Sequence, residues 1–517
     1  MNSRNLTLTC VCTFLCGCSV ENILSEKEYN QGINVLPLPQ NINVGSGRFI
    51  ISKSTQITIS DDSLGQVADF YARKMQASTG MNVKVTDKKV ENAINLSIDR
   101  NVGKGLDTEL AAESYLLSVK ENGVDIKASS LRGLFYGMAT LMQLLPAEIE
   151  SGHEISHAVW SVPVVDISDS PRFKYRGLML DVARHFISVE GLKKHIDMLA
   201  SVKINNLHLH LTDYQEWRIE IRKYPRLTAV GGTRIDEYGK EYSGFYTQEE
   251  IKDLVKYARE RFVNIIPEID VPGHSAEDKL QSYAISRCEQ ILKKYGKKLI
   301  GWDEILQGGL APEATVMSWR GEAGGIASAL MNHNVIMTPT SGGMYFDHYQ
   351  GNSQAEPFAW GGYAPIVRSY NYNPVPDTLV KMGKEKYILG VQGNAWTECM
   401  YTEDIVEYRV YPRIFAVAET GWTPDGKKDF NDFSRRLNNM AVRMDYHGIN
   451  YHIPLPEQPD FCRNHVAFTD VASVSFGTSR PMKMVYTTDG TEPDLHSPVY
   501  DKPIQTDTTC TIRIRSV

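Results

Sequence analysis

Hydrophobic and polar positions follow two different rhythms along this chain. Between residues 35 and 165, short apolar stretches alternate with two amphipathic segments, which predicts a small α/β domain. The first segment, residues 61–80, begins with polar capping residues and repeats apolar positions every three to four residues; the second covers residues 131–145. Between them, Asn122 and Gly123 separate two apolar stretches, which predicts a β-hairpin.

The rhythm changes near residue 175, where an apolar strand, a loop and an amphipathic helix follow one another repeatedly. This order predicts parallel βαβ units that close into a β/α barrel of the TIM type. Helices are expected at residues 189–202, 247–261, 277–295 and 402–419. The expected strands are residues 177–182, 206–212, 263–269, 298–302, 315–319, 335–338 and 388–392. Seven of the eight strands of a standard barrel are therefore recognisable.

These patterns divide the chain into expected domains. The N-terminal α/β domain takes residues 34–168, the barrel takes residues 169–452, and residues 453–517 are β-rich, as in part of a small β-sandwich. The chain ends inside an expected strand. We therefore expect either an edge strand or a fragment of a longer domain.

Composition narrows the class of protein. Of the 517 residues, 42% are hydrophobic and 23% are charged, and no uninterrupted apolar run approaches the roughly 20 residues of a membrane-spanning helix. We therefore expect no integral membrane protein. The net charge of -7 has acids and bases interspersed, so no basic patch is present to bind a phosphate backbone. Nucleic acid is accordingly not expected as a partner.

The first 18 residues have the order of an export signal: one arginine, a short apolar stretch, then small residues before Cys18. They resemble a bacterial lipoprotein signal, which implies cleavage before Cys18, its acylation, and a linker over residues 19–33. The expected location is the bacterial periplasm or cell surface, with membrane contact only through the lipid anchor. A plain secretion signal and a metal cluster of Cys10, Cys12, Cys16 and Cys18 are the alternatives. The four other cysteines receive no function.

Aromatic and acidic side chains gather where the expected barrel strands end, which is where barrels of this type carry their active sites. A single tryptophan at such a place is more often core than ligand platform, and a single acid there is more often a cap. The repetition favours a sugar pocket, because aromatic faces cover the C–H side of a pyranose while carboxylates and arginine take its hydroxyls. In chain order the group is Arg176, Asp181, Arg184, Asp213, Trp217, Glu268, Asp270, His274, Trp302, Asp303, Glu304, Trp319, Arg320, Tyr345, Asp347, Trp396 and Glu398.

Several of these residues lie in segments that resemble signatures of family-20 glycoside hydrolases, the β-N-acetylhexosaminidases. The two longest are Tyr175-Arg-Gly-Leu-Met-Leu-Asp-Val-Ala-Arg-His-Phe186 and Ile266-Pro-Glu-Ile-Asp-Val-Pro-Gly-His-Ser275. Shorter ones are His210-Leu-Thr-Asp, Gly301-Trp-Asp-Glu, Ser318-Trp-Arg-Gly, Tyr345-Phe-Asp and Ala395-Trp-Thr-Glu. The resemblance also covers residues 35–146 and the C-terminal module.

The resemblance implies a role for each matched residue. Arg176 would hold ring hydroxyls of the terminal sugar, with Asp347 and Glu398 at its far edge. Asp213 and His274 would form a dyad that tunes the general acid. The remaining implied roles are the cavity wall for Trp302, Trp319 and Trp396, the acetamido contact for Tyr345, and support for Asp270 and Glu304.

The family's acid pair is not found in this sequence. In the substrate-assisted reaction of the family, the acetamido oxygen of the substrate attacks the anomeric carbon, a glutamic acid protonates the leaving oxygen, and an adjacent aspartate orients the acetamido group. The resemblance places this pair in a His-x-Gly-Gly-Asp-Glu segment after the fourth strand. Here Ser275 and Ala276 lead directly to Glu277 and the next helix, so the fourth strand and its pair are expected to be missing between them. Asp303 and Glu304 are either a relocated pair or, as their neighbours favour, supporting residues.

Three functions stay open at this point. The first is an exported exo-acting hydrolase that removes terminal β-linked N-acetylglucosamine or N-acetylgalactosamine from glycans and whose sequence has lost an internal piece. The second is a surface lipoprotein that binds sugar without cleaving it, and the third is an inactive relic. None of them calls for a metal or an organic cofactor.

Overall fold

The computed structural model describes residues 33–235, 239–270, 278–307, 309–458 and 465–517. Residues 34–517 form one compact unit. The expected leader, the linker up to Gly32 and His274 therefore lie outside the described residues. No helix within the described ranges is both long and apolar enough to cross a membrane.

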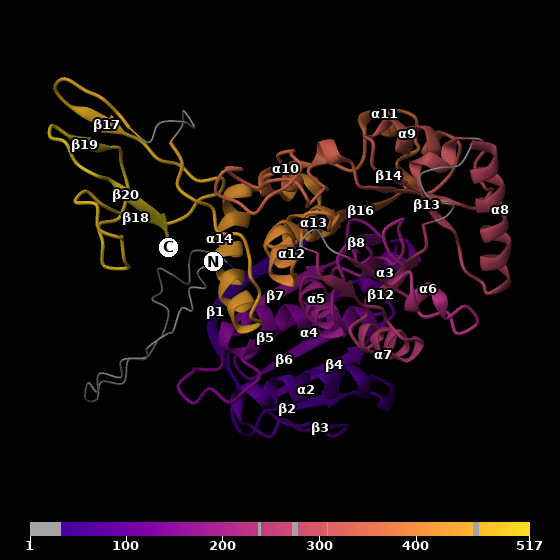
Figure 1. Cartoon of the computed structure of the whole chain (residues 1–517). Helices are drawn as coiled ribbons and strands as arrows, with labels where there is room; N and C mark the ends of the chain where they lie inside the picture. Colours follow the sequence, from indigo (N-terminus) through magenta and orange to yellow (C-terminus); the bar gives the residue numbers. More distant parts are fainter. Residues whose placement is uncertain (1–32, 236–238, 271–277, 308, 459–464) are drawn as a thin grey trace. The chain divides into compact units, whose positions relative to one another are not determined.

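The N-terminal part is a mixed sheet of seven strands in the order β1-β7-β5-β6-β4-β2-β3 (Figure 1). The predicted hairpin is confirmed: β5 and β6 pair antiparallel, with Lys120 opposite Gly123. Helix α4 is almost entirely buried, and Tyr71 of α2 donates a hydrogen bond to the Phe135 carbonyl of α4. The elements are β1 (Asn41–Ile50), β2 (Gln56–Ile59), η1 (Asp62–Leu64), α2 (Gly65–Thr79), β3 (Val85–Thr86), β4 (Ala93–Ile98), α3 (Thr108–Glu113), β5 (Tyr115–Lys120), β6 (Gly123–Ala128), α4 (Leu131–Leu144), η2 (Ala147–Glu150) and β7 (Ser161–Asp169).

The barrel part contains all seven predicted strands in one parallel sheet of TIM-barrel type. Its order is β12-β9-β8-β16-β15-β14-β13. The strands are β8 (Tyr175–Asp181), β9 (Asn206–His210), β12 (Asn264–Glu268), β13 (Ile300–Trp302), β14 (Thr315–Ser318), β15 (Val335–Met337) and β16 (Ile388–Ala395). Numbered as barrel strands, this order is three, two, one, eight, seven, six, five. The sheet is therefore open where the fourth strand would stand.

Burial differs between the middle and the edges of this sheet. Every residue of β8, β9, β14 and β15 is buried. On β12, Asn264 and Pro267 are exposed and the other residues are half-buried, and all three residues of β13 are half-buried. An inner parallel strand is normally covered on both faces and both edges. The exposure of β12 and β13 follows from the neighbour that neither strand has in the described part of the chain.

Helices and short turns connect the barrel strands. The predicted single helix at residues 402–419 is wrong in one respect: it divides into α12 and α13 at Pro412, which has no N–H to continue the α12 ladder. The elements are α5 (Val189–Ser201), α6 (Arg226–Ala229), β10 (Thr233–Ile235), β11 (Glu241–Ser243), α7 (Gln248–Arg259), α8 (Asp278–Lys294), η3 (Asp303–Leu306), α9 (Ala323–Leu330), η4 (Thr340–Gly342), α10 (Ile366–Asn371), α11 (Asp377–Lys381), η5 (Glu385–Tyr387), α12 (Glu403–Val410), α13 (Arg413–Trp422), η6 (Asp425–Lys427) and α14 (Phe430–Tyr446).

The C-terminal part contains two short antiparallel pairs. Strand β17 (Ala472–Val474) pairs with β19 (Ile504–Thr506), and β18 (Met484–Thr487) pairs with β20 (Arg513–Ser516). The β-rich character expected of this part of the chain is thus confirmed.

Candidate functional site

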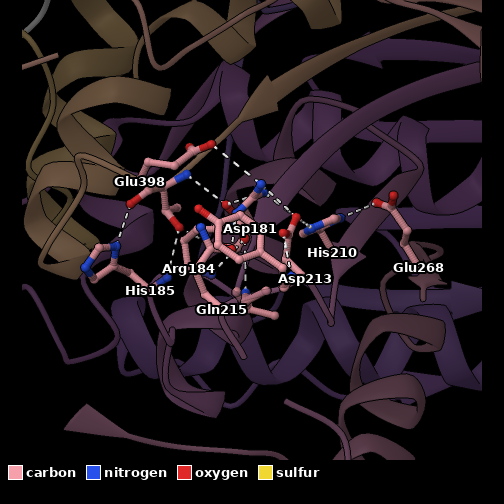
Figure 2. Close-up of polar contacts among 12 residues, drawn as sticks. Asp181, Arg184, His185, His210, Asp213, Gln215, Glu268 and Glu398 are labelled. Atoms are coloured by element: carbon pink, nitrogen blue, oxygen red, sulfur yellow. Dashed lines mark hydrogen bonds and ion pairs between the residues drawn. The ribbon is translucent and has the colours of Figure 1, made fainter. Parts of the chain in front are cut away.

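Arg184 is the centre of a polar cluster where β8, β9 and β16 end (Figure 2). Its Nη2 lies 2.7 Å from Asp213 Oδ2 and 3.7 Å from Glu398 Oε1, and its Nη1 lies 3.2 Å from Asp181 Oδ2. Asp181 also accepts hydrogen bonds from the backbone N–H groups of Ala183 and Arg184, which holds the turn after β8. Only 7% of Arg184 is exposed, so its position is tightly determined.

His210 connects this cluster to the edge strand β12. Its Nε2 lies 2.9 Å from Asp213 Oδ2, and its Nδ1 lies 2.9 Å from Glu268 Oε2. Burial alone would lower the pKa of His210, but Glu268 and Asp213 raise it to about 10. Burial opposes the charge of Glu268, yet His210 and His208 hold the pKa of that carboxyl well below its usual range. Glu268 is therefore an ionised carboxylate beside an imidazolium, and such a carboxylate has no proton to give to a leaving group.

Four aromatic side chains stand beside these charges. Trp396 contacts the His210 ring at 5.0 Å between centroids, the Trp302 ring at 5.6 Å and the Tyr345 ring at 6.4 Å. Trp319 stacks on Tyr345 at 6.0 Å. Side chains from β13, β14, the loop after β15 and the end of β16 thus form one continuous aromatic group, next to the Arg184 guanidinium at 5.3 Å from the Trp396 ring.

Acids hold the tryptophans in place. Trp302 Nε1 donates to Glu268 Oε1 at 2.6 Å, which joins the edge strands β13 and β12 through side chains alone. Trp319 Nε1 donates to both Glu304 oxygens at 3.0 and 3.1 Å. Asp303 accepts from the backbone N–H of Trp319 and pairs with Arg320 at 2.6 Å. Asp303 and Glu304 thus orient neighbouring groups, as supporting residues do.

Asp347 and Glu398 differ from Asp213 and Glu268 in the direction of their pKa shifts. The pKa values of Asp347 and Glu398 are raised, whereas those of Asp213 and Glu268 are lowered. Burial raises the pKa of Asp347 to about 6, against the opposing charges of Arg413 and Arg409. Burial also raises the pKa of Glu398, against Arg184. Among the described residues, Asp347 Oδ1 is buried without a hydrogen-bond partner, and Glu398 has its nearest cation, Arg184, at 3.7 Å. A carboxyl so placed gains from a hydroxyl that donates to it. These two acids therefore suit the hydroxyls of a sugar.

Arg176 does not take part in this site, so the role expected for it is wrong. It lies at the other end of β8, is fully buried, and donates to Glu113 Oε2 at 2.6 Å and to the carbonyls of Phe173 and Lys203. From the beginning of β8, the Arg176 guanidinium cannot reach the carboxyl ends of the strands, where the cluster of Arg184 lies. Arg184, three residues after the end of β8, lies among the strand-end acids instead. Its position just beyond the strand is the sequence signal that distinguishes it from Arg176.

His274 and Asp270 are two more of the expected site residues. His274, the expected partner of Asp213, lies outside the described residues, and in the structure Asp213 contacts His210 and Arg184. Asp270 is half-buried, and its backbone N–H donates to Thr212 Oγ1 at 2.9 Å.

Sequence reasoning missed Trp360, which is 78% exposed on the loop that follows Asp347. This loop is held firmly: the Tyr349 hydroxyl both accepts from the N–H of Ala359 and donates to its carbonyl, each at 2.9 Å. Buried Glu356 pairs with Arg409 at 2.9 Å in the same loop. A large aromatic ring on a well-held loop offers a flat face to a ligand. Its only sequence signal was a tryptophan among glycines and prolines.

Known proteins resemble this chain over its whole described length. The model of the glycosyl hydrolase family 20 catalytic domain matches residues 173–278 and 275–425. Domain 2 of the same family matches residues 32–170, and the chitobiase/beta-hexosaminidase C-terminal domain matches residues 467–517. A beta-hexosaminidase of Porphyromonas gingivalis is 45% identical, over 95% of this chain and 73% of the relative. The chain belongs to glycoside hydrolase family 20.

Solved structures agree with this assignment. The family-20 β-N-acetylhexosaminidase of Streptomyces coelicolor A3(2) has a TM-score of 0.72 and 28% identity, over 81% of this chain and 97% of its own. A mutant Streptomyces plicatus β-hexosaminidase in complex with the product GlcNAc has a TM-score of 0.72 and 27% identity, over 81% and 96%. With its family and its named relatives, the chain is a glycosidase of the β-hexosaminidase class.

The matches to this family also have a discontinuity. The catalytic-domain model matches in two pieces that meet at residues 275–278, where the acid pair was expected. The alignment with the Porphyromonas gingivalis relative runs over 577 positions but includes 95% of 517 residues, or about 491. The relative therefore has about 86 residues opposite gaps in this chain. The open edge between β12 and β13 lies at the same junction.

Proposed function

We propose that this family-20 glycosidase recognises the terminal β-linked N-acetylhexosamine of glycans, as N-acetylglucosamine or N-acetylgalactosamine, in the exo manner. The observation that carries the proposal is the joint arrangement of Arg184, the acids Asp347 and Glu398, and the aromatic group around Trp396. Aromatic faces fit the C–H side of the ring, and the charged groups fit its hydroxyls.

The reaction proposed for this pocket is the substrate-assisted one of its family. The acetamido oxygen of the sugar attacks the anomeric carbon and displaces the leaving oxygen, with retention after water opens the cyclic intermediate. The protein then has to hold the acetamido group and protonate the leaving oxygen. Tyr345 lies against both Trp319 and Trp396, where its hydroxyl suits the acetamido oxygen.

The protonation step needs a segment that this sequence lacks. No Gly-Gly-Asp-Glu stretch occurs in it. The acids around the cluster are otherwise engaged: Glu268 is ionised beside His210, and Glu304 accepts from Trp319. We therefore propose that the chain, with its sequence as it stands, binds the sugar and hydrolyses it no faster than buffer does.

The first candidate function is thus a hydrolase whose sequence here has lost an internal piece. A non-catalytic sugar-binding protein on the same scaffold, for which the junction at Ser275 to Glu277 is real, is the second. It is favoured by the contrast between an assembled sugar-holding group and the missing acid pair. A relic that no longer folds well is the third, and it predicts neither catalysis nor binding.

Two measurements on the full chain separate these functions. The first is turnover of an aryl β-N-acetylglucosaminide, expected at the rate of buffer; clear hydrolysis would refute the claim that the acid is missing. The second is calorimetry with N-acetylglucosamine, for wild type, for Arg184→Met and for the surface control Lys193→Met. Binding that is lost only in Arg184→Met supports the pocket, whereas no binding by the wild type leaves the relic. Resequencing the locus across Ser275 to Glu277 tests whether the junction is real.

We also propose that the chain is exported and held to a membrane through a lipid on Cys18. Support comes from the order of charge, apolar stretch and small residues in the first 18 positions. Metabolic labelling with a radioactive fatty acid tests this. Label should be incorporated by the wild type and not by Cys18→Ala, with Cys16→Ala as the matched control that keeps the label.

A further inference from the structure

The N-terminal sheet has a cavity of about 360 Å³ at one end. It is formed where β1 begins, where β5 begins, where β7 ends and by the loop after β4. Polar groups dominate its wall. Among the residues that line it are Gln40, Asp99, Lys104, Leu116, Ser168 and Asp169.

Asp169 gives this cavity a firmly built floor. It is 3% exposed, and its carboxylate accepts from the Tyr115 hydroxyl at 2.6 Å, from Trp422 Nε1 at 3.0 Å and from the N–H of Gln40 at 3.0 Å. Lys203 Nζ lies 3.5 Å from the same carboxylate and balances its charge. A wall held by so many contacts keeps its shape without a ligand, which is the condition of a preformed site.

The rim of the cavity carries both polar and apolar groups. Asp99 accepts from the Asn101 backbone and side-chain amide, and Lys104 and Ser168 are exposed beside it. Leu106 and Leu116 are 44% and 39% exposed and supply apolar surface. One acid and one lysine on the rim cancel in charge, so neither a strong anion nor a cation is favoured. Hydroxyl, amide and aliphatic groups together fit a neutral polyhydroxylated ring.

We propose that this cavity is a second saccharide-binding site, which takes one ring of a neutral oligosaccharide built from N-acetylhexosamine. Its lining residue Asp169 contacts Trp422 and Lys203, which lie around Arg176 at the beginning of β8. The sugar cluster of Arg184 lies beyond the other end of β8, a strand of seven residues that spans roughly 20 Å. The two sites therefore take separate sugar chains or separate branches of one glycan. The choice of sugar rests on the proposed function.

Titration of the full chain with tetra-N-acetylchitotetraose tests the second site. Arg184→Met weakens the first site, so binding that keeps the Kd of the wild type in this variant reports the cavity. Ser168→Trp fills the cavity, and Asp166→Trp is the matched control, because Asp166 is exposed on the same face of β7 two residues away and does not line it. Thermal unfolding of all variants verifies that each is folded.

We expect Arg184→Met to retain binding, Arg184→Met with Ser168→Trp to bind at least about tenfold more weakly, and Arg184→Met with Asp166→Trp to bind unchanged. Loss of all binding in Arg184→Met alone overturns the second site while leaving the first intact. Equal binding with and without Ser168→Trp overturns it as well. If Arg184→Met binds as the wild type does, and Ser168→Trp alone removes the binding, the proposed function fails and the cavity stands.

Discussion

The two sides of the barrel sheet show what a neighbouring strand contributes. Strands β8, β9 and β16 lie between neighbours and are buried along almost all of their length, and at their ends Arg184 lies within 3.2 Å of both Asp181 and Asp213. Strands β12 and β13 are partly exposed and are joined to each other only through Trp302 and Glu268 among the contacts described. The Arg184 cluster thus lies on the covered part of the sheet, whereas β12 and β13 are the edges between which the fourth barrel strand was expected.

Restoring the strand expected between β12 and β13 should have the largest effect, and this effect is on the rate of hydrolysis. Inserting at the junction of Ser275 and Glu277 a family-20 segment whose strand ends in Gly-Gly-Asp-Glu should restore the fourth strand and the acid pair. Turnover of an aryl β-N-acetylglucosaminide should then rise by at least about 10²–10⁴-fold, the usual contribution of a general acid. The same insert with its acid glutamate changed to glutamine is the control and should stay near the rate of buffer. An insert that leaves the rate unchanged would contradict the location assigned to the gap.

The next largest effect distinguishes Arg176 from Arg184, which lie at the two ends of β8. Arg176→Met takes from the buried carboxylate Glu113 its nearest partner, so the free energy of unfolding should fall by about 3–5 kcal/mol, while the folded fraction binds sugar normally. Arg184→Met should instead raise the Kd for N-acetylglucosamine by about 10- to 150-fold, the loss of a charged hydrogen bond. Urea unfolding and calorimetry measure the two. A binding defect in folded Arg176→Met would reverse the assignment.

A smaller effect compares adjacent strands in register. Leu207 of β9 is fully buried, and its partner Ile265 of β12 is half-buried. Leu207→Ala should lower the free energy of unfolding by about 2–5 kcal/mol. Ile265→Ala should lower it by less than about 2 kcal/mol, because part of its surface already meets solvent. Equal losses in urea unfolding would mean that β12 is as well covered as β9.

The smallest effect concerns pH. Burial raises the pKa of Asp347 to about 6, so its carboxylate is ionised above that pH and accepts sugar hydroxyls there. Binding should therefore weaken as pH falls through 6, by about tenfold at pH 5, where only a tenth of the group is charged. Asp347→Asn should bind weakly at every pH and show no step near pH 6. A step of the same size in Asp347→Asn would assign it to another group, such as Glu398.

Much of this architecture could be predicted from the sequence. Each predicted barrel strand overlaps an observed one, because alternation of apolar runs with amphipathic helices is a local property of the chain. The break of the expected helix at Pro412 was not predicted, although the proline was visible. The aromatic and acidic residues at strand ends were also visible, whereas their pairing was not. His210 shows this best: it contacts Asp213 three residues away and Glu268 on another strand.

The sequence by itself determined the strands, the family and the absence of the Gly-Gly-Asp-Glu stretch, because these depend on residue order alone. The tertiary structure was needed to show which arginine joins the strand-end acids, since Arg176 and Arg184 lie eight positions apart on one strand and its following turn but at opposite ends of the barrel. It also decided that the gap in the sequence is an open edge between β12 and β13. The physical reason is that periodicity is read along the chain, while burial and charge pairing depend on which strands become neighbours.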